Sequence, residues 1–294
     1  MILVRLNGGL GNQLFQYAAG YALAKKNNVE LKIDLSSYSE NRSRLPEILK
    51  LSISAKIADI DEVRRYRNPY GIISKVKRFI SQKIYKKYYV DWEPSVLNKS
   101  GNIYLDGYFQ SDLYFSHCTQ DLVREFQISQ QRLDNISDTI SLIHGLPNCV
   151  SIHVRRGDYV TDHRTKFLHD ICGNSYFGEA VAKIESILES CNFLVFSDDI
   201  DWVMKNMDLP QSTHYISGRT RYDGNVLDSV DELYLMSICK HHIISNSTFS
   251  WWGAYLNSSA EKRVIYPSLW NRSSSFKHRY IIPTTWNSHK IITY

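Results

Sequence analysis

The pattern of apolar positions at the start of the chain predicts a strand, a turn, a helix and a second strand. Ile2–Leu6 is a short apolar run that ends in a glycine-rich turn, and Leu31–Leu35 is a second apolar run. Between them, apolar residues recur at helical spacing, at Leu14, Tyr17, Ala18, Tyr21, Ala22 and Leu23. A strand–helix–strand unit of this kind is typical of a parallel sheet.

A second series of the same kind follows a turn-rich stretch at residues 145–148. Three short apolar runs predict strands, at Val150–Val154, Phe193–Phe196 and His242–Ile244. The segments between and after them predict helices over about 175–188, 231–239 and 248–256. We therefore expect an α/β protein with two facing Rossmann-like domains, over residues 1–145 and 146–294. A ligand would bind in the crevice at the carboxyl ends of the strands.

Positive charge is concentrated in one segment. The chain has 35 Lys and Arg against 30 Asp and Glu, a net charge of +5, which is too mild to indicate a nucleic-acid partner. Residues 63–90 hold nine basic residues and no acidic one, so the remaining 26 basic and 30 acidic residues carry −4. One face of a predicted helix in this segment is apolar, at Ile73, Val76, Ile80 and Ile84. Such a helix either packs on its own domain or makes peripheral contact with an anionic membrane.

The cysteines and the first residues indicate a cytoplasmic protein. The five cysteines are odd in number and no two form a CxxC pair, which argues against a secreted disulfide framework and a structural zinc site. The first residues contain no basic leader, and no apolar run approaches the ~20 residues of a spanning helix. We expect free thiols and a cytoplasmic location, with any inner-membrane contact limited to the surface.

The strongest chemical signal is the segment His153-Val-Arg155-Arg156-Gly157-Asp158, at the end of a predicted strand. Side chains alternate along a strand, so His153 and Arg155 point to the same face. Two guanidinium groups at the mouth of a crevice are suited to bind a phosphate or diphosphate, and Asp158 can orient one of them. The alternative is a surface arginine pair held by a nearby acid.

A polar segment, residues 245–250, opens the helix predicted over 248–256. Hydroxyl groups at a helix start either cap the helix or join its free backbone N–H groups in holding an anion. In the second case, three residues would hold phosphates opposite the arginines: Ser247, Thr248 and Ser250. Trp251 and Trp252 are predicted to pack in the core.

Acidic residues follow the strand predicted over 193–196, in the sequence Ser197-Asp198-Asp199-Ile-Asp201. Three interpretations are open. The carboxylates accept hydrogen bonds from ribose hydroxyls or a base edge, or Asp199 and Asp201 hold Mn²⁺ or Mg²⁺ in an Asp-x-Asp pattern, or one aspartate caps a helix.

The turn over residues 8–13 lacks the features of two phosphate-binding loops. Leu14 stands where a GxGxxG fingerprint has its third glycine, and no Gly-Lys-Ser/Thr follows. The sequence of this turn therefore argues against a dinucleotide-dependent hydride transfer and against ATP hydrolysis. Asn12 either caps the following helix or, with Gln13, faces a second substrate.

Four segments together resemble the bacterial α-1,2-fucosyltransferases of glycosyltransferase family 11. They are RLNGGLGNQLFQYAAGYALA at 5–24, LDGYFQSDLYF at 105–115, SIHVRRGDYV at 151–160 and DELYLMSICKHHIISNSTFSWWGAYL at 231–256. The resemblance implies a GT-B-like architecture with the active site in the cleft between the domains, the donor on the C-terminal domain and the acceptor on the N-terminal one. It also implies inverting transfer of L-fucose from GDP-β-L-fucose to the 2-hydroxyl of an acceptor sugar, commonly galactose, with no metal or other cofactor.

The resemblance implies roles for individual residues. Arg155 would meet the diphosphate and the leaving oxygen, and Asp158 would support the arginines or the fucose. Asn12 and Gln13 would lie on the acceptor side. With the acidic segment included, the predicted donor-binding residues are His153, Arg155, Arg156, Asp158, Ser197, Asp198, Asp199, Asn246, Ser247, Thr248 and Ser250. No base is singled out: the candidates are His153, Asp158, Asp34 and Asp112, or a late proton transfer without a dedicated base.

Three other functions fit parts of the pattern. A metal-dependent transferase acting on another sugar nucleotide would use Asp199 and Asp201. A glycosidase needs two carboxylates at a set separation, such as Asp158 and Asp199, but has no use for paired arginines. A non-catalytic sugar-binding module would explain the 20 Tyr and 6 Trp.

Overall fold

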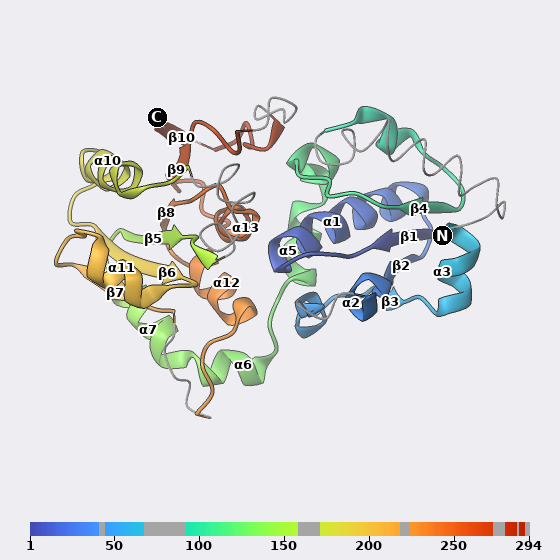
Figure 1. Cartoon of the computed structure of the whole chain (residues 1–294), viewed down its shortest axis with the longest axis horizontal. Coiled ribbons are helices and arrows are strands. Elements are labelled where there is room, and N and C mark those ends of the chain that lie inside the picture. Colours follow the sequence, from blue (N-terminus) through green and yellow to red (C-terminus); the bar gives the residue numbers. More distant parts are fainter. Residues whose placement is uncertain are drawn as a thin grey trace. The chain divides into compact units, whose positions relative to one another are not determined.

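The computed structural model describes residues 1–40, 45–67, 92–157, 171–217, 224–272, 280–286 and 288–291. The chain divides into two compact α/β units (Figure 1). Unit 1 consists of Met1–Gln127 and Ser274–Pro283, and unit 2 consists of Ile128–Ser273 and Thr284–Tyr294.

Unit 1 is built on a parallel sheet in which the described strands have the order β3-β2-β1-β4. The strands are β1 (Ile2–Arg5), β2 (Leu31–Asp34), β3 (Lys56–Ile57) and β4 (Ile103–Leu105). The α-helices are α1 (Leu10–Asn27), α2 (Ser36–Glu40), α3 (Ile60–Arg67) and α5 (Thr119–Glu125). The 3₁₀ helices are η1 (Glu47–Lys50), η2 (Pro94–Asn98), η3 (Asp112–Tyr114) and η4 (Ser116–Cys118).

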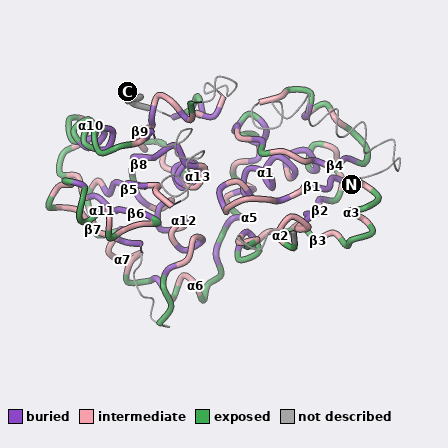
Figure 2. Tube along the Cα trace, in the orientation of Figure 1, coloured by how far each residue is buried: buried purple, intermediate pink, exposed green. Residues whose placement is uncertain are grey.

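The strand–helix–strand unit predicted at the start of the chain is confirmed by β1, α1 and β2. The predicted apolar positions of α1 face the core: Leu14, Ala18 and Ala22 are fully buried. Figure 2 shows this burial along α1 and β1. The helix is capped by Asn28, which has a left-handed φ of +51° and donates its N–H to carbonyls of the last turn.

Unit 2 is built on a second parallel sheet, whose described strands have the order β10-β9-β8-β5-β6-β7. The strands are β5 (Cys149–Val154), β6 (Asn192–Ser197), β7 (Thr213–Tyr215), β8 (His241–Ile243), β9 (Val264–Pro267) and β10 (Ser288–Ile291). The helices are α6 (Gln130–Asn135), α7 (Ser137–Gly145), α10 (Asn174–Glu185), α11 (Ile200–Asn206), α12 (Ser229–Ser237) and α13 (Thr248–Leu256).

The core of unit 2 lies against its central strands. Every residue of β5 is buried, as expected for a parallel strand covered on both faces. Phe193 and Val195 of β6 pack with Phe177 and Ile184 of α10 in one apolar cluster. The three predicted strands and the three predicted helices of this half are confirmed, with boundaries shifted by a few residues.

The two units divide between Gln127 and Ile128 rather than after residue 145. The helices α6 and α7 belong to unit 2 because α7 contacts α12, and because Arg132 of α6 forms ion pairs with two aspartates at the start of α12. A turn-rich stretch marks where the chain bends, whereas a domain boundary depends on where contacts are few. The facing arrangement of the two halves around a cleft stays a prediction.

Two further predictions concern the thiols and the basic segment. All five cysteines are free, as predicted, and Cys118, Cys149 and Cys239 are buried. Of the basic segment 63–90, only residues 63–67 fall within the described part, at the end of α3, so the predicted amphipathic helix lies outside it. None of the described helices has the length and apolar character needed to span a membrane.

Two adjacent histidines of β8 are buried in the sheet of unit 2. His242 shares a hydrogen bond of 2.8 Å with the Ser151 hydroxyl, and its other ring nitrogen lies 2.8 Å from Asn257 Nδ2. Burial holds its pKa well below the ordinary value. Burial, with Lys240 and Arg263 nearby, lowers the pKa of His241 to about 4. Both rings are therefore neutral in the folded protein at neutral pH.

We expect the free energy of unfolding to fall as the pH drops below about 6.5, where unfolded histidines take up a proton. Folded His241 takes up its proton only near pH 4. Between those limits, each buried histidine lowers the free energy of unfolding by up to ~1.4 kcal/mol for every pH unit. Above the pKa of the unfolded histidines this loss is absent. Urea denaturation across this range measures the slope. His241→Asn should make the free energy of unfolding depend less steeply on pH, and the exposed-site control His144→Asn should not. An equal pH dependence in the His241 variant and the unmodified protein would contradict the expectation.

Candidate functional site

Three segments with candidate chemistry leave the same edge of the unit 2 sheet. β5 and β6 pair along their length, and their last residues, Val154 and Ser197, are register partners. Arg155 and Asp198, which come next in each chain segment, therefore emerge side by side. β8 lies on the other side of β5, so the loop that leads to α13 leaves from this edge too. The carboxyl edge of a parallel sheet is where α/β proteins bind ligands.

Two aspartates hold the two arginines in place. Arg155 Nη1 lies 2.6 Å from Asp198 Oδ2, and the backbone N–H of Arg156 donates to Asp198 Oδ1 at 2.8 Å. Arg156 Nε donates to Asp199 Oδ2 at 3.2 Å, and its guanidinium lies over the Trp202 ring, 3.4 Å from the ring centre. Both guanidiniums are half-buried and fixed by charge-assisted hydrogen bonds, which are stronger than neutral ones.

Helix capping, one of the three interpretations of the acidic segment, is confirmed for Asp199. Its Oδ1 accepts from the backbone N–H of Trp202 at 3.3 Å and so caps α11, while its own N–H donates to Ser197 Oγ at 3.1 Å. Asp201 is exposed in the first turn of the helix. Within the described ranges, no three His, Cys, Asp or Glu side chains are grouped so that they could hold a metal ion.

His153 links β5 to the loop after β8. The ring is buried, its Nδ1 shares a 3.0 Å hydrogen bond with Ser245 Oγ, and its centre lies 5.5 Å from that of Phe249. Burial lowers the pKa of His153 to about 3, and the Arg155 charge acts in the same direction against the opposing effect of Asp198. The ring is neutral at neutral pH and such a low pKa makes it a poor proton acceptor.

The loop and first turn of α13 contain both cap and core residues. The Ser247 hydroxyl caps the helix by accepting from the N–H of Phe249 at 3.3 Å. The hydroxyl of Ser250 is fully buried and donates to the carbonyls of Ser245 and Ser247. Thr248 is half-buried at the first helical position. The capping interpretation is confirmed for Ser247, and Ser250 is a structural residue.

Asn246 and the tryptophans pack within unit 2. Asn246 is buried, donates to the carbonyl of Trp270 at 2.9 Å, and accepts from Cys172 Sγ at 3.5 Å. Trp251 and Trp252 are fully buried, which confirms the prediction that they belong to the core.

Glu232, a residue that the sequence did not single out, lies beside the arginine–aspartate cluster. It is half-buried in the first turn of α12 and hydrogen-bonds Ser217, whose hydroxyl also accepts the N–H of Ser197 at 2.8 Å. Burial raises the pKa of Glu232 to about 7, and the nearby Asp198 charge adds to this effect. An acidic residue in a first helical turn is ordinary, so only the tertiary contacts mark it.

The family to which the chain belongs follows from a comparison with family models. The model described as glycosyl transferase family 11 matches residues 1–289. The chain is a member of glycosyltransferase family 11.

Relatives of this family 11 protein include enzymes with different named activities. It is 32% identical to the O-antigen biosynthesis glycosyltransferase WbnK of Escherichia coli, over 90% of this chain and 93% of that protein. It is 31% identical to an alpha-1,2-colitosyltransferase of the same organism, over 97% and 98%. The human galactoside alpha-(1,2)-fucosyltransferase 1 is 24% identical over 85% of this chain and 64% of its own length.

Solved structures share the fold of the chain at low sequence identity. NodZ alpha-1,6-fucosyltransferase soaked with GDP-fucose matches with a TM-score of 0.55 and 12% identity, covering 87% of this chain and 91% of NodZ. Arabidopsis thaliana FUT1 in complex with GDP matches with a TM-score of 0.53 and 13% identity, covering 90% and 70%. The α/β fold with parallel sheets is therefore similar to that of fucosyltransferases.

The residues predicted for the acceptor side of this family 11 protein lie in unit 1. Gln13 is fully buried, donates to the carbonyls of Gly8 and Leu45, and accepts from the N–H of Ile48. Both of its amide hydrogens are thus used to hold the turn, which gives Gln13 a structural role. Asn12 is half-buried and accepts from Gln110 Nε2 at 3.0 Å. Contact with an acceptor stays a prediction for Asn12.

Of the other base candidates, two carboxylates of unit 1 are buried. Asp34 accepts from the Tyr104 hydroxyl at 2.6 Å and from the N–H of Ser36 at 2.8 Å, so it joins β2 to β4. Burial raises the pKa of Asp112 to about 6, which is in the range of a proton acceptor near neutral pH. Asp158, the fourth candidate, lies outside the described residues.

A substitution at Gly157 tests whether the position of the Asp198 carboxylate affects ligand binding. A Cβ at position 157 would lie 2.5 Å from Asp198 Oδ2, closer than atoms approach, so Gly157→Ala displaces this carboxylate from Arg155. We expect the affinity for inorganic pyrophosphate to fall about tenfold, the loss typical of one charge-assisted hydrogen bond. Calorimetry measures it.

The matched control for this glycine is Gly178→Ala in α10, where an added Cβ meets nothing within 4 Å. This variant should bind pyrophosphate as the unmodified protein does. Equal affinity for pyrophosphate in the Gly157 variant and the control would show that the ligand does not depend on Asp198.

Proposed function

We propose that this family 11 glycosyltransferase moves L-fucose from GDP-β-L-fucose to the 2-hydroxyl of a galactose-containing acceptor, with inversion at the anomeric carbon. The observation that carries the proposal is the arginine pair held by Asp198 and Asp199 at the carboxyl edge of the unit 2 sheet. A diphosphate is the ligand whose charge and geometry suit two fixed guanidiniums.

The reaction develops charge where these cations would lie. The acceptor oxygen forms a bond to the anomeric carbon while the bond from that carbon to the β-phosphate oxygen breaks. The electron pair leaves with GDP, so negative charge grows on the diphosphate as positive charge grows on the sugar ring. Cations that are already in place stabilise that state without reorganisation. Arg155 supplies the contact to the leaving oxygen in this proposal, and Arg156 supports it.

Preorganisation is what the aspartates contribute. An arginine side chain that is not held by a partner turns toward water and must be ordered again when a ligand binds. Asp198 bonds the side chain of Arg155 and the backbone of Arg156, and Asp199 with Trp202 holds the side chain of Arg156. The α13 start adds the positive end of a helix dipole, with Ser247 and Thr248 as its first groups.

Carboxylates at the same edge supply acceptors for the nucleoside. Ribose hydroxyls and the N–H groups of a base are hydrogen-bond donors, and a half-buried carboxylate such as Glu232 accepts from them. Glu232 is half-buried, hydrogen-bonds Ser217 and lies close enough to Asp198 for the two charges to interact, which supports a role in holding the nucleoside beside the diphosphate.

The proton of the acceptor hydroxyl needs a destination. Burial and the low pKa of His153 count against this candidate, and so do the two hydrogen bonds that Asp34 accepts. Asp158, which would support the arginines or the fucose, and Asp112 remain the proposed candidates, together with a late transfer that uses no dedicated base.

A second donor is favoured by one relative. The alpha-1,2-colitosyltransferase matches over nearly the full length of both chains, whereas the mammalian fucosyltransferases match more weakly. Transfer of L-colitose to a 2-hydroxyl is therefore the alternative function, and it would use the same arginine pair.

The proposal includes no metal and no other cofactor. Contact of residues 63–90 with an anionic membrane also stays a prediction, since most of the segment lies outside the described residues.

A donor comparison tests the proposed function. We expect GDP-β-L-fucose to bind more tightly than GDP-L-colitose in calorimetric titration, and to release GDP when galactosides are supplied. NMR of the product should show an α-1,2 linkage. EDTA should leave turnover unchanged; a loss restored by Mn²⁺ would instead favour the metal-dependent transferase. Faster turnover of GDP-colitose would establish the alternative donor, and no turnover of either would overturn both.

Arg155→Ala should lower the transfer rate by at least ~10²–10³, because one preorganised contact to the developing charge is lost. The fold should survive because the side chain lies at the end of a strand and is partly exposed. Circular dichroism and GDP release by the purified variant measure the two effects. Arg124→Ala, on an exposed ion pair of α5, is the matched control. A folded Arg155 variant with normal turnover would contradict the assignment.

A further inference from the structure

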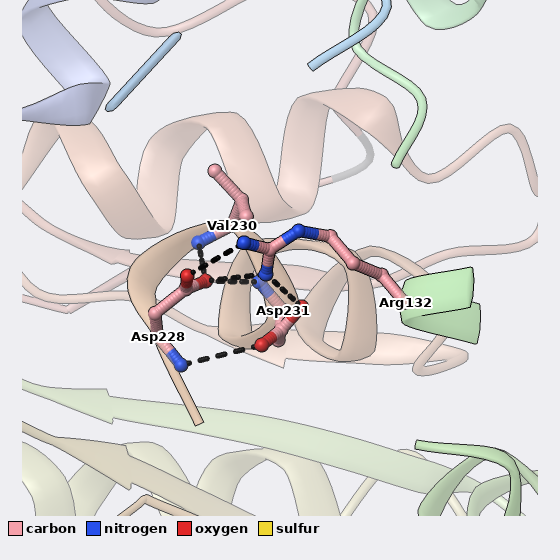
Figure 3. Close-up of polar contacts among 4 residues, drawn as sticks. All are labelled: Arg132, Asp228, Val230 and Asp231. Carbon is pink, nitrogen blue, oxygen red and sulfur yellow. Dashed lines mark hydrogen bonds and ion pairs between the residues drawn. The ribbon is translucent and has the colours of Figure 1, made fainter. Parts of the chain in front are cut away.

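One arginine of unit 2 binds the start of the helix that carries Glu232. Arg132 of α6 donates through Nη1 to Asp231 at 2.8 Å and to Asp228 Oδ1 at 3.1 Å, and through Nη2 to Asp228 Oδ2 at 3.0 Å (Figure 3). The guanidinium thus grips Asp228 with two nitrogens and Asp231 with one. Planar two-point contacts of this kind fix orientation as well as distance.

The two aspartates are themselves the cap of α12. Asp228 accepts from the N–H groups of Val230 and Asp231, and the Asp231 carboxylate accepts from the N–H of Asp228, which makes a capping box (Figure 3). Asp231 is fully buried. If Arg132 were removed, the buried Asp231 carboxylate would lose the cation that α6 supplies. A buried carboxylate that has lost its paired cation is strongly unfavourable.

The first turn of α12 places Glu232 at the candidate site. Glu232 follows Asp231 directly, and its N–H donates to the carbonyl of Asp228 at 3.0 Å. Its carboxyl group hydrogen-bonds Ser217, and the Ser217 hydroxyl accepts from the N–H of Ser197, the residue before Asp198, at 2.8 Å. Any rotation or fraying of this turn therefore moves Glu232 relative to the arginine–aspartate cluster.

The rest of α12 is packed too closely to compensate. A Cβ at Gly253 of α13 would lie 2.5 Å from Met236 Sδ of α12, so the two helices are in contact at this point. The helix body is fixed there, and the orientation of its first turn depends on its cap.

We infer that Arg132 is a positioning residue for nucleotide binding: it holds the capped first turn of α12 so that Glu232 faces the nucleoside beside the arginine–aspartate cluster. This inference rests on the proposed function, because it needs a nucleotide at the carboxyl edge of the unit 2 sheet. Arg132 acts at a distance from the ligand, through Asp228 and Asp231, and sets affinity rather than the chemical step.

The experiment compares GDP affinity by calorimetry and thermal unfolding in four variants of the full chain. Arg132→Ala and Glu232→Gln should each weaken GDP binding about tenfold, as expected when one charge-assisted hydrogen bond is lost. In the double variant, Arg132→Ala should cost less than about a further twofold, because the residue through which it acts is already altered. Arg132→Lys, which keeps the charge, should recover part of the affinity and serves if the alanine variant does not fold.

The matched control is Lys262→Met. Lys262 donates to the carbonyls of Ala254 and Asn257 at the far end of α13, so it is also a cation that holds a helix end in unit 2. This variant should lower the unfolding temperature but leave GDP affinity within about twofold of the unmodified value.

The outcomes distinguish a failure of the proposed function from a failure of the role inferred for Arg132. If the unmodified chain does not bind GDP, the proposed function fails and the inference fails with it. If the unmodified chain binds GDP and Arg132→Ala binds it equally well, only the inference fails. Full additivity of Arg132→Ala and Glu232→Gln, or an equal loss of affinity in Lys262→Met, would likewise overturn it by showing a general effect of stability.

Discussion

The candidate site depends on one carboxylate, that of Asp198, at the point where two parallel strands end. It binds the guanidinium of Arg155 and the backbone N–H of Arg156, and so joins the segment after β6 to the segment after β5. Each of the two arginines has a carboxylate partner at this edge, Asp198 for Arg155 and Asp199 for Arg156. The absence of a side chain at Gly157 is part of the same arrangement, since a Cβ there would occupy the space of the carboxylate.

Many polar residues of the family segments serve the fold before they serve a ligand. Loops at the edge of a sheet contain backbone groups that have no partner in the strand ladder, and buried groups of this kind need a hydrogen bond. Ser250 and Asn246 supply such bonds in unit 2, and Gln13 supplies them in unit 1. His153 belongs to this group too, because burial keeps its ring neutral and its Nδ1 bonds Ser245. A shared polar motif therefore contains scaffold residues as well as residues that can reach a substrate.

The second organising element of unit 2 is the pair of helices α12 and α13. Their close contact at Gly253 fixes the helix whose start lies at the sheet edge, and the capped turn of α12 brings Glu232 to Ser217 and Asp198. The family resemblance of this pair extends over the continuous segment 231–256. Within this segment α12 and α13 are in direct contact, at Met236 and Gly253.

The α/β class, the parallel strands and the polar segments at the strand ends could be predicted from the sequence, because apolar periodicity and short strand–helix connections restrict the chain to few arrangements. The sequence also singled out the arginine pair and the buried tryptophans, whose chemistry is evident from residue type. Three features became evident from the folded structure alone: Asp199 is a helix cap and a partner of Arg156, the units divide after residue 127, and Glu232 lies near Asp198. These features depend on contacts between residues far apart in the chain, and neither periodicity nor residue type contains that information.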